Sequence, residues 1–283
     1  MTIDLYALGW DEHVGAGYAR FDRPDQRPAR VTGVDRGVCC LLGSDGAARA
    51  SLGGALLSEG ARDPLALPCA GDWVVVRTWP DRRTTVEAVL PRRTRIVRGT
   101  AGGRSPGRSH GQVLAANVDL AAVVEPMDPA PDASRIERLL ALARASGAAP
   151  LVILTRADLV RRPDRIAAQV ADLAPGVPVL TVSTRTGAGL DRLRTMIAPG
   201  RTLALLGRSG AGKSSLVNAL AGATVMATQA IRRVDGRGRR TTTYRALTPL
   251  PGGGLVVDTP GLPGVGLHEA ADTLDRAAGG FHR

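Results

Sequence analysis

Residues 207–214 read Gly207-Arg208-Ser209-Gly210-Ala211-Gly212-Lys213-Ser214. This is the pattern G-x-x-x-x-G-K-[ST], in which the backbone N–H groups of a glycine-rich loop surround phosphate oxygens and the lysine bonds the β- and γ-phosphates. The stretch follows an apolar run at 203–206 and precedes a helix-like segment at 215–220. A strand, a loop and a helix in this order are the context that the motif requires. The segment therefore predicts a nucleoside-triphosphate site on an α/β fold.

Lys213 is the only lysine of the 283-residue chain, in which every other one of the 37 basic residues is arginine. A compact ammonium on a thin stem passes beside the loop backbone where a planar guanidinium would clash. The position of the sole lysine therefore supports the phosphate-binding interpretation. The hydroxyl of Ser214 is expected to bind Mg²⁺, and Ser215 completes the nucleotide-binding residues expected in this segment.

Two later segments have the character of a switch pair, which orders around a γ-phosphate. The first is a Gly- and Arg-rich run at 236–243, from which Thr241 or Thr242 is expected to close over the nucleotide and complete the Mg²⁺ shell. The second is Asp258-Thr259-Pro260-Gly261, directly after an apolar strand predicted at 255–257. Asp258 is expected to help hold Mg²⁺, and the N–H of Gly261 to face the γ-phosphate.

The choice of base is predicted to lie in Thr155-Arg156-Ala157-Asp158, which follows an apolar strand at 151–154. A carboxylate at Asp158 can accept protons from both N1 and the 2-amino group of guanine, and adenine presents no such pair of donors. The alternative is that Asp158 caps a helix, since Asp is common at that position. Farther along, Ser183 is expected to place its amide or hydroxyl against the base oxygen.

The C-terminal part of the chain alternates apolar runs with amphipathic segments. Strands are predicted at 118–124 and 177–182, besides those named above, and helices at 133–145 and 165–173. Apolar strands that alternate with helices indicate a mainly parallel sheet covered on both faces.

The N-terminal part reads instead as short strands separated by glycine turns, at 30–34, 38–42, 73–76 and 85–90. This pattern predicts a small all-β barrel such as an OB-fold. A stretch rich in Gly, Arg and Ser at 99–111 is predicted to be a flexible connector. The predicted organisation is thus an OB-fold region at 1–98, the connector at 99–111 and a nucleotide-binding domain at 112–283.

The formal net charge of +11 indicates a polyanionic partner, of which nucleic acid is the leading class. An Arg-rich genome is the alternative explanation. The arginines gather in two clusters: Arg82, Arg83, Arg92, Arg93, Arg95, Arg98, Arg104 and Arg108, and then Arg232, Arg233, Arg237, Arg239 and Arg240. Aromatic residues make up 3% of the chain, so phosphate contacts should dominate. Trp73 and Trp79 could stack bases, but packing in the barrel is the favoured interpretation for Trp73, since tryptophan is usually mostly buried.

Other features of the sequence point to the cytoplasm. No apolar run approaches the roughly 18–20 residues that span a bilayer, and the N-terminus lacks a basic-then-apolar export signal. The three cysteines, Cys39, Cys40 and Cys69, have no metal-ligand spacing and suit a reducing compartment.

The order of these segments is unusual, because the base-reading segments precede the phosphate loop. In this the chain resembles the circularly permuted, ribosome small-subunit-dependent GTPases of the RsgA (YjeQ-like) family. The segments that carry the resemblance are Leu8-Gly9-Trp10, Pro91-Arg92-Arg93-Thr94, Val113-Leu114-Ala115-Ala116-Asn117-Val118-Asp119, the phosphate loop through Asn218, and Asp258-Thr259-Pro260-Gly261. The resemblance implies an N-terminal OB-fold, a permuted GTPase domain, Mg²⁺ with GTP, and slow hydrolysis stimulated by the small (30S) subunit. It also implies 16S rRNA as a partner in late maturation of that subunit.

The chain departs from the family pattern at several positions. The family usually continues into a zinc region of three cysteines and a histidine, but no cysteine here follows Cys69, so we expect no zinc. The usual histidine before the threonines is Arg240, which cannot act as a base but can stabilise γ-phosphate charge. Thr155 and Arg156 replace the usual Asn and Lys. Leu262 stands where Ras-like enzymes have a water-orienting glutamine, so unaided hydrolysis should be slow.

The expected catalytic residues are therefore Lys213, Arg240, Thr241 and Thr242, in a monomeric GTP hydrolase. Two alternatives stay open. One is a non-hydrolysing RNA-assembly factor whose nucleotide site acts only as a conformational clamp, and the other is a shortened relic of a longer GTPase.

Overall fold

The computed structural model describes residues 3–99, 111–225 and 246–259, and these form two compact units. The first unit contains the residues up to 118 together with 199–202 and 246–257. The second contains 119–198, 203–225 and 258–259. Among the described helices, none combines the length and the apolar character needed to cross a membrane. The switch residues Arg240, Thr241, Thr242 and Gly261 lie outside the described residues, as does most of the predicted connector.

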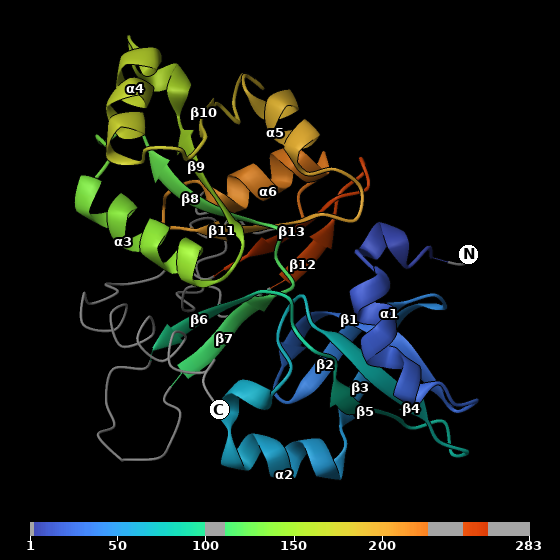
Figure 1. The fold of residues 1–283 in the computed structure, drawn as a ribbon. Coiled ribbons are helices and arrows are strands. Elements are labelled where there is room, and N and C mark those ends of the chain that lie inside the picture. Colours follow the sequence, from blue (N-terminus) through green and yellow to red (C-terminus); the bar gives the residue numbers. More distant parts are fainter. Residues whose placement is uncertain (1–2, 100–110, 226–245, 260–283) are drawn as a thin grey trace, which may run out of the picture. The chain divides into compact units, whose positions relative to one another are not determined.

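The first unit is built on a closed barrel with the strand order β1-β2-β3-β5-β4. Its strands are β1 (Gln26–Asp35), β2 (Val38–Gly43), β3 (Gly46–Leu52), β4 (Trp73–Thr78) and β5 (Thr84–Val89). The barrel closes through antiparallel pairing of β1 with β4 and parallel pairing of β3 with β5. In β2 every second residue is buried, as expected for a strand with one face on a core. The predicted OB-like barrel is confirmed (Figure 1).

Several other elements complete this unit. The first unit also contains the helices α1 (Glu12–Tyr18) and α2 (Gly54–Arg62), and Leu56 of α2 packs in the barrel core. Strands β6 (Arg95–Gly99) and β7 (Gly111–Ala116) form an antiparallel pair in which Gly99 lies opposite Gly111. The two ends of the predicted connector are therefore paired strand residues. Short 3₁₀ turns lie at Tyr6–Leu8, Ala19–Phe21 and Pro64–Ala66.

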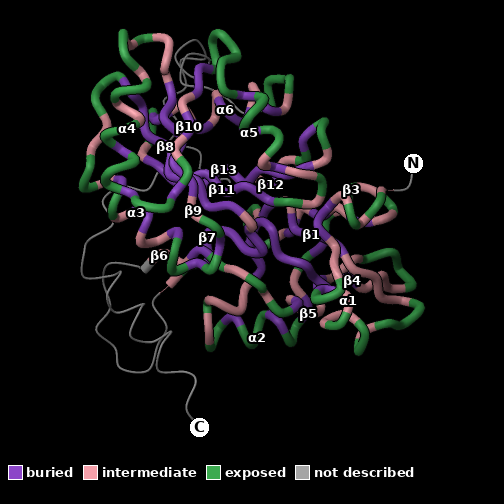
Figure 2. The backbone as a smooth tube through the Cα atoms, turned by 45° about the horizontal axis from the view of Figure 1, so that its top comes forward, coloured by how far each residue is buried: buried purple, intermediate pink, exposed green. Residues whose placement is uncertain are grey.

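A six-stranded sheet has the order β10-β9-β8-β11-β13-β12. Its strands are β8 (Leu120–Pro126), β9 (Ala149–Thr155), β10 (Val179–Val182), β11 (Thr202–Leu206), β12 (Ala246–Pro249) and β13 (Leu255–Asp258). Strand β9 pairs in parallel with β10 and β8, and β8 pairs in parallel with β11. Every residue of β8 and of β11 is buried, which explains why these strands read as continuous apolar runs (Figure 2).

Two pairs of helices cover the strands of the second unit. Helix α3 (Ala133–Ala145) packs on β8 and β9 and against α4 (Pro163–Leu173), which packs on β10. Helix α5 (Leu190–Met196) packs against α6 (Lys213–Ala221). Figure 1 shows the two pairs on opposite sides of these strands. The predicted α/β layering is thus confirmed, and α3 has the same bounds as the predicted helix.

Arg30 is buried in the first unit, with 1% of its surface exposed. Its guanidinium donates hydrogen bonds to the carbonyls of Leu8, Gly71 (3.2 Å) and Asn117 (3.0 Å), and to Thr202 Oγ1 (2.9 Å). Five donors in one planar group suit such a set of diverging acceptors. Arg30 therefore ties together four separate parts of the chain.

Arg92 and Arg93, which the sequence analysis assigned to a basic cluster, also form ion pairs within the fold. The Arg92 guanidinium bonds both carboxylate oxygens of the fully buried Asp72, at 2.7 and 2.8 Å. Burial works against the charge of Arg92, but the hydrogen bond and the charge of Asp72 outweigh it and raise the Arg92 pKa. Arg93 pairs with Asp11 at 3.3 Å. Because its guanidinium is taken up by Asp72, Arg92 is an ion-pair partner inside the fold and no phosphate contact.

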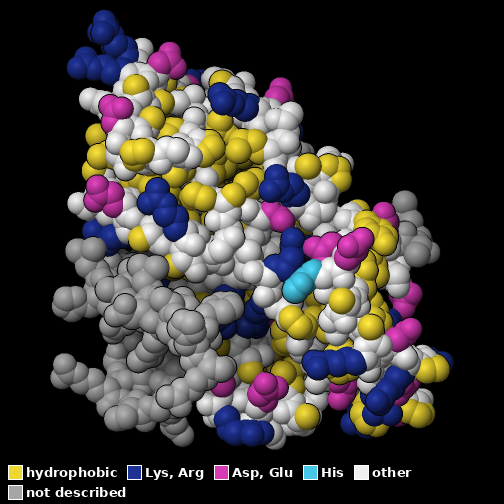
Figure 3. All heavy atoms as spheres, viewed as in Figure 1, with side chains coloured by type: hydrophobic (Ala, Val, Ile, Leu, Met, Phe, Trp, Pro, Cys, Tyr) yellow, Lys and Arg dark blue, Asp and Glu magenta, His cyan; other side chains and the backbone are white. Residues whose placement is uncertain are grey.

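On the face seen in Figure 3, dark blue basic side chains stand in separate places among acidic ones.

Trp73 settles one of the alternatives left by the sequence. Its side chain is 1% exposed and meets Trp10 edge to face, with ring centroids 5.0 Å apart. The Arg30 guanidinium lies 5.6 Å from the Trp73 ring centroid. Trp73 therefore packs the fold, as the favoured interpretation predicts, and its ring is not available to stack bases.

Candidate nucleotide-binding site

The predicted phosphate loop connects β11 to α6, as the motif requires. An added Cβ on Gly207 would lie 2.5 Å from the carbonyl oxygen of Val124, so no larger residue fits there. Gly212 precedes α6 with a φ of 97°, a left-handed conformation that favours glycine. These two glycines let the backbone turn tightly between strand and helix, and α6 begins at Lys213.

The Lys213 ammonium lies inside this loop. It donates hydrogen bonds to the carbonyl oxygens of Gly207 (2.9 Å) and Arg208 (3.0 Å), and the residue is 7% exposed. Burial lowers the pKa of Lys213, against the opposing effect of the Asp258 and Glu125 charges. Both bonds are to neutral carbonyls, so phosphate oxygens can replace them with a gain in charge pairing.

The predicted base-reading loop is bonded directly to the phosphate loop. Thr155, the last residue of β9, donates its hydroxyl to the carbonyl of Ala211 at 2.7 Å. Arg156, at a φ of 61°, donates to the carbonyl of Gly210 at 2.8 Å and to that of Asp128. Although the bonded residues of these two loops are 54 and 56 positions apart in the sequence, the structure places the loops side by side. Thr155 and Arg156 thus join the loops instead of pointing away from them.

Asp158 lies in a 3₁₀ turn at Ala157–Leu159, and both of its carboxylate oxygens accept hydrogen bonds. Oδ1 accepts from the Ser183 hydroxyl at 2.6 Å, and Oδ2 accepts from Arg185 Nε at 2.7 Å. The Ser183 hydroxyl, followed by Arg185, lowers the pKa of Asp158, which favours the ionised form. The residue in the capping position of that turn is Arg156, so the alternative of Asp158 as a helix cap is wrong.

Ser183 uses both of the groups expected at the base on protein partners. Its backbone N–H donates to the carbonyl of Ala188 at 2.9 Å, and its hydroxyl donates to Asp158. The expected contact of Ser183 with a base oxygen stays a prediction. Ser183 instead orients the carboxylate that we expect to read the base.

At the end of β13, Asp258 approaches the start of α6. Ser214 Oγ donates to Asp258 Oδ2 at 3.3 Å, and Asp258 is buried. The next residue, Thr259, donates its hydroxyl to the carbonyl of Leu205 in β11 at 2.6 Å, which fixes the chain where it leaves the strand. A carboxylate and a hydroxyl are hard oxygen donors of the kind that Mg²⁺ prefers. Within the described ranges, no group of three His, Cys, Asp or Glu side chains is placed to hold a metal ion by itself.

Two residues of this region were not singled out from the sequence. Glu125, fully buried near the end of β8, pairs with Arg135 of α3 at 2.5 and 3.1 Å, and its charge acts on Lys213. A lone carboxylate near the end of an all-apolar strand is a signal that could have revealed it. Arg185, whose side chain is 71% exposed, gave no signal, because its partner is distant in the sequence.

Comparison with known proteins agrees with this geometry. The RsgA GTPase family model matches residues 89–268. A relative from Streptomyces coelicolor, named small ribosomal subunit biogenesis GTPase RsgA, is 50% identical over 275 residues, covering 96% of this chain and 72% of the relative. A protein of the same name from Streptomyces avermitilis is 48% identical over 269 residues, covering 94% and 70%.

Two solved structures share the fold. YjeQ from Thermotoga maritima matches with a TM-score of 0.60 and 23% identity, over 88% of this chain and 82% of that one. YloQ, described as a circularly permuted GTPase, matches with a TM-score of 0.56 and 20% identity, over 93% and 84%. In this chain β9 and the expected base-reading loop come before β11 and the phosphate loop. The chain therefore belongs to the RsgA GTPase family.

Proposed function

We propose that this chain hydrolyses GTP to GDP and phosphate during maturation of the small ribosomal subunit, the process for which its curated relatives are named. One observation carries the proposal. The hydrogen bond from Thr155 to Ala211, 2.7 Å long, joins the loop that bears Asp158 to the loop that bears Lys213. A guanine on Asp158 and a triphosphate on Lys213 would therefore belong to one bound molecule.

The Lys213 ammonium exchanges its hydrogen-bond partners when the phosphate loop binds the nucleotide. The ammonium of Lys213 leaves the carbonyls of Gly207 and Arg208 and bonds the β- and γ-phosphate oxygens. Backbone N–H groups at the start of α6 add further donors, and the positive end of the helix dipole favours the anionic ligand. The loop backbone keeps its shape because its glycines already hold the tight turn.

Ser214 and Asp258 would hold Mg²⁺, since they bring a hydroxyl and a carboxylate within 3.3 Å of each other beside the phosphate loop. When bound, Mg²⁺ neutralises charge on the β- and γ-phosphate oxygens. The bond from Thr259 to Leu205 positions Asp258 for this task.

In the reaction, a water oxygen attacks the γ-phosphorus, and the bond from that phosphorus to the β–γ bridging oxygen breaks. GDP leaves, and the protons of the water pass to phosphate and solvent. Leu262 cannot orient the water by a hydrogen bond, so the unaided reaction is slow and a partner completes the site. Arg240 would stabilise charge on the γ-phosphate, and Thr241 or Thr242 would close over it.

The partner is the small ribosomal subunit with its 16S rRNA. A net charge of +11 supports a polyanionic partner, and salt should weaken the association strongly. Such a partner places the activity in the cytoplasm.

A second candidate is a nucleotide-dependent clamp that binds GTP without hydrolysing it. Leu262 and Arg240, which replace the water-orienting and histidine residues of related enzymes, favour this candidate.

GTP turnover, measured with and without purified small ribosomal subunits, tests the proposal. Turnover stimulated by the subunits and abolished in Lys213→Ala supports it. GTP binding without turnover in either condition would replace it with the clamp. Turnover unchanged by Lys213→Ala would refute the assignment of the phosphate loop.

A further inference from the structure

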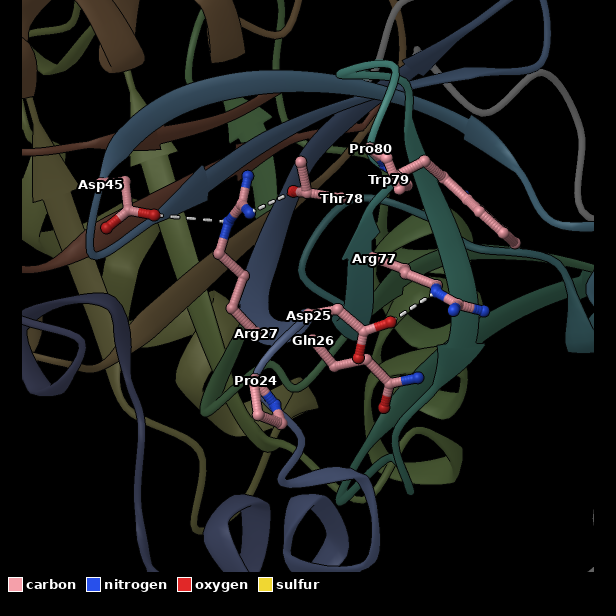
Figure 4. Close-up of a pocket in the computed structure, with 9 residues that line it drawn as sticks. All are labelled: Pro24, Asp25, Gln26, Arg27, Asp45, Arg77, Thr78, Trp79 and Pro80. Atoms are coloured by element: carbon pink, nitrogen blue, oxygen red, sulfur yellow. Dashed lines mark hydrogen bonds and ion pairs between the residues drawn. The ribbon is translucent and has the colours of Figure 1, made fainter.

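A pocket of about 540 Å³ opens on the barrel, between the start of β1, the end of β4 and the β2–β3 turn (Figure 4). It belongs wholly to the first unit and shares no residue with the nucleotide site. Its lining includes Asp25, Gln26, Arg27, Arg77 and Trp79. The enzyme mechanism uses none of these side chains, so the pocket needs an explanation of its own.

The side of the pocket formed by β4 and the turn that follows it contains a planar stack. The Arg77 guanidinium carbon lies 4.0 Å from the centroid of the Trp79 ring. Trp79 donates Nε1–H to Thr85 Oγ1 at 2.8 Å, which fixes the plane of the indole. Asp25 pairs with Arg77 Nε at 2.7 Å and so holds the guanidinium over the ring. Figure 4 shows Asp25, Arg77 and Trp79 in this sequence along the pocket. An ordered indole and guanidinium form a stacking platform for another flat, delocalised group.

The charge of the lining argues against a phosphate ligand in the pocket itself. Arg77 is paired with Asp25, and Arg27 is paired with Asp45 at 3.4 Å and donates to Thr78 Oγ1. Two guanidinium groups balanced by two carboxylates leave the lining formally neutral. A neutral, planar ligand with hydrogen-bonding edges therefore suits the pocket better than an anion does.

Gln26 has an acceptor that could bond the edge of such a ligand. Its Oε1 is buried, and no partner for it occurs within the part of the chain that the structure describes. A buried acceptor without a partner is destabilising. A shift of the Gln26 side chain that opens Oε1 to the pocket would let the exocyclic amino group of adenine, cytosine or guanine donate to it.

Charges suited to phosphates lie next to the pocket instead of inside it. Arg23 is exposed and directly precedes the lining residue Pro24. Arg82 is exposed in the turn after Trp79, where its N–H bonds the Trp79 carbonyl at 2.9 Å. A neutral stacking pocket flanked by exposed arginines matches a base with its neighbouring phosphates.

We propose that this pocket binds one unstacked base of a single-stranded RNA, with the base against the Trp79–Arg77 stack and the flanking phosphates near Arg23 and Arg82. Single-stranded segments are the form in which RNA bases can leave their own stack and meet aromatic and Arg planes. The choice of RNA rests on the proposed function, while the chemistry of the pocket stands on the barrel alone.

The test uses the full chain and fluorescein-labelled RNA pentanucleotides, with affinity measured by fluorescence anisotropy. Trp79→Ala should weaken binding about 5- to 150-fold, which corresponds to about 1–3 kcal/mol for one stacked base. Trp79→Phe keeps a flat ring and should restore most of the affinity. Arg77→Ala should weaken binding more than Arg49→Ala, a matched loss of one charge at an exposed position on β3 of the same barrel. Circular dichroism of each variant controls for folding.

Three results would overturn the proposal: pentanucleotide affinity unchanged by Trp79→Ala, equal losses for Arg77→Ala and Arg49→Ala, or a nucleoside monophosphate that displaces the labelled pentanucleotide as effectively as unlabelled pentanucleotide does. The last would assign the pocket to a free nucleotide. If Trp79→Ala has no effect on RNA binding but small subunits still stimulate GTP turnover, the pocket proposal fails and the proposed function stands. If small subunits do not stimulate turnover but Trp79→Ala still weakens RNA binding, the proposed function fails and the pocket proposal stands.

Discussion

Arg185 Nε lies 2.7 Å from Asp158 Oδ2, on the carboxylate that is expected to read guanine. The Ser183 hydroxyl holds the other oxygen at 2.6 Å. If Asp158 reads guanine as expected, the N1–H and the 2-amino group of the base would need the oxygens that now accept from these two protein donors. Since Ser183 lies within a tight loop and the Arg185 side chain is 71% exposed, Arg185 is the donor that can leave.

Arg185→Ala should therefore speed the binding of guanine nucleotides. An exposed ion pair is weak, so removing it should raise the fraction of open Asp158 and the association rate constant by up to about fivefold. Stopped-flow binding of a fluorescent GDP analogue measures this rate. Arg194→Ala, which removes another exposed arginine paired with an aspartate, should leave the rate unchanged. A slower rate in Arg185→Ala would show that Arg185 assists binding.

Asp158→Asn should turn the base preference away from guanine. A hydrogen bond to a charged group is stronger than one between neutral groups, so GTP affinity should fall at least about tenfold. The new amide donor matches the 2-oxo group of xanthine, so the affinity for xanthosine triphosphate should rise. Asp164→Asn, an equal charge change at an exposed position of α4, is the control. Unchanged relative affinities for GTP, ATP and xanthosine triphosphate would remove Asp158 from its assigned role.

The sequence could predict these loops because their chemistry is local. A phosphate loop is a contiguous run, and the strands β8 and β11 read as apolar runs because each is buried along its whole length. Strand β3 escaped prediction because it is rich in alanine and only one of its residues is buried. Gly99 and Gly111, which pair across β6 and β7, were predicted to be the ends of a connector. Glycine is typical of loops, and the sequence alone did not show that the two residues face each other in a pair of strands.

The partners of the arginines could not be predicted, because they depend on residues far apart in the sequence. Arg30, Arg92 and Arg185 look alike in the sequence, yet one is a buried hub, one a buried ion pair and one an exposed partner of Asp158. A bulge between Val31 and Gly33 disturbs the alternation of β1, and residues 29–31 are all buried. The pattern of that strand therefore gave no sign that Arg30 points into the fold.

Arg30→Met should destabilise the first unit by at least about 3 kcal/mol, because several buried acceptors lose a charged donor at once. Arg30→Lys should recover little of the loss, since an ammonium cannot reach the same diverging acceptors. Urea unfolding followed by tryptophan fluorescence measures the change, because Trp73 lies beside Arg30. Arg49→Met, at an exposed position of β3, should stay within about 0.5 kcal/mol of the parent. An unfolding midpoint unaffected by Arg30→Met would contradict the role of Arg30 as a hub.

Cys39 should make the fold sensitive to alkali. Burial, with smaller effects of Asp72 and Cys40, raises the pKa of the Cys39 thiol to about 12. The folded chain keeps this thiol protonated at a pH where the unfolded chain has already lost the proton, so its stabilising effect is complete below about pH 9 and is lost as the pH rises toward 12. The urea midpoint should therefore fall over this window, and it should fall less steeply in Cys39→Ala. In the folded protein at pH 8, a thiol reagent should label the half-buried Cys40 well before Cys39. Equal labelling rates for the two cysteines would show that the barrel interior admits solvent at Cys39.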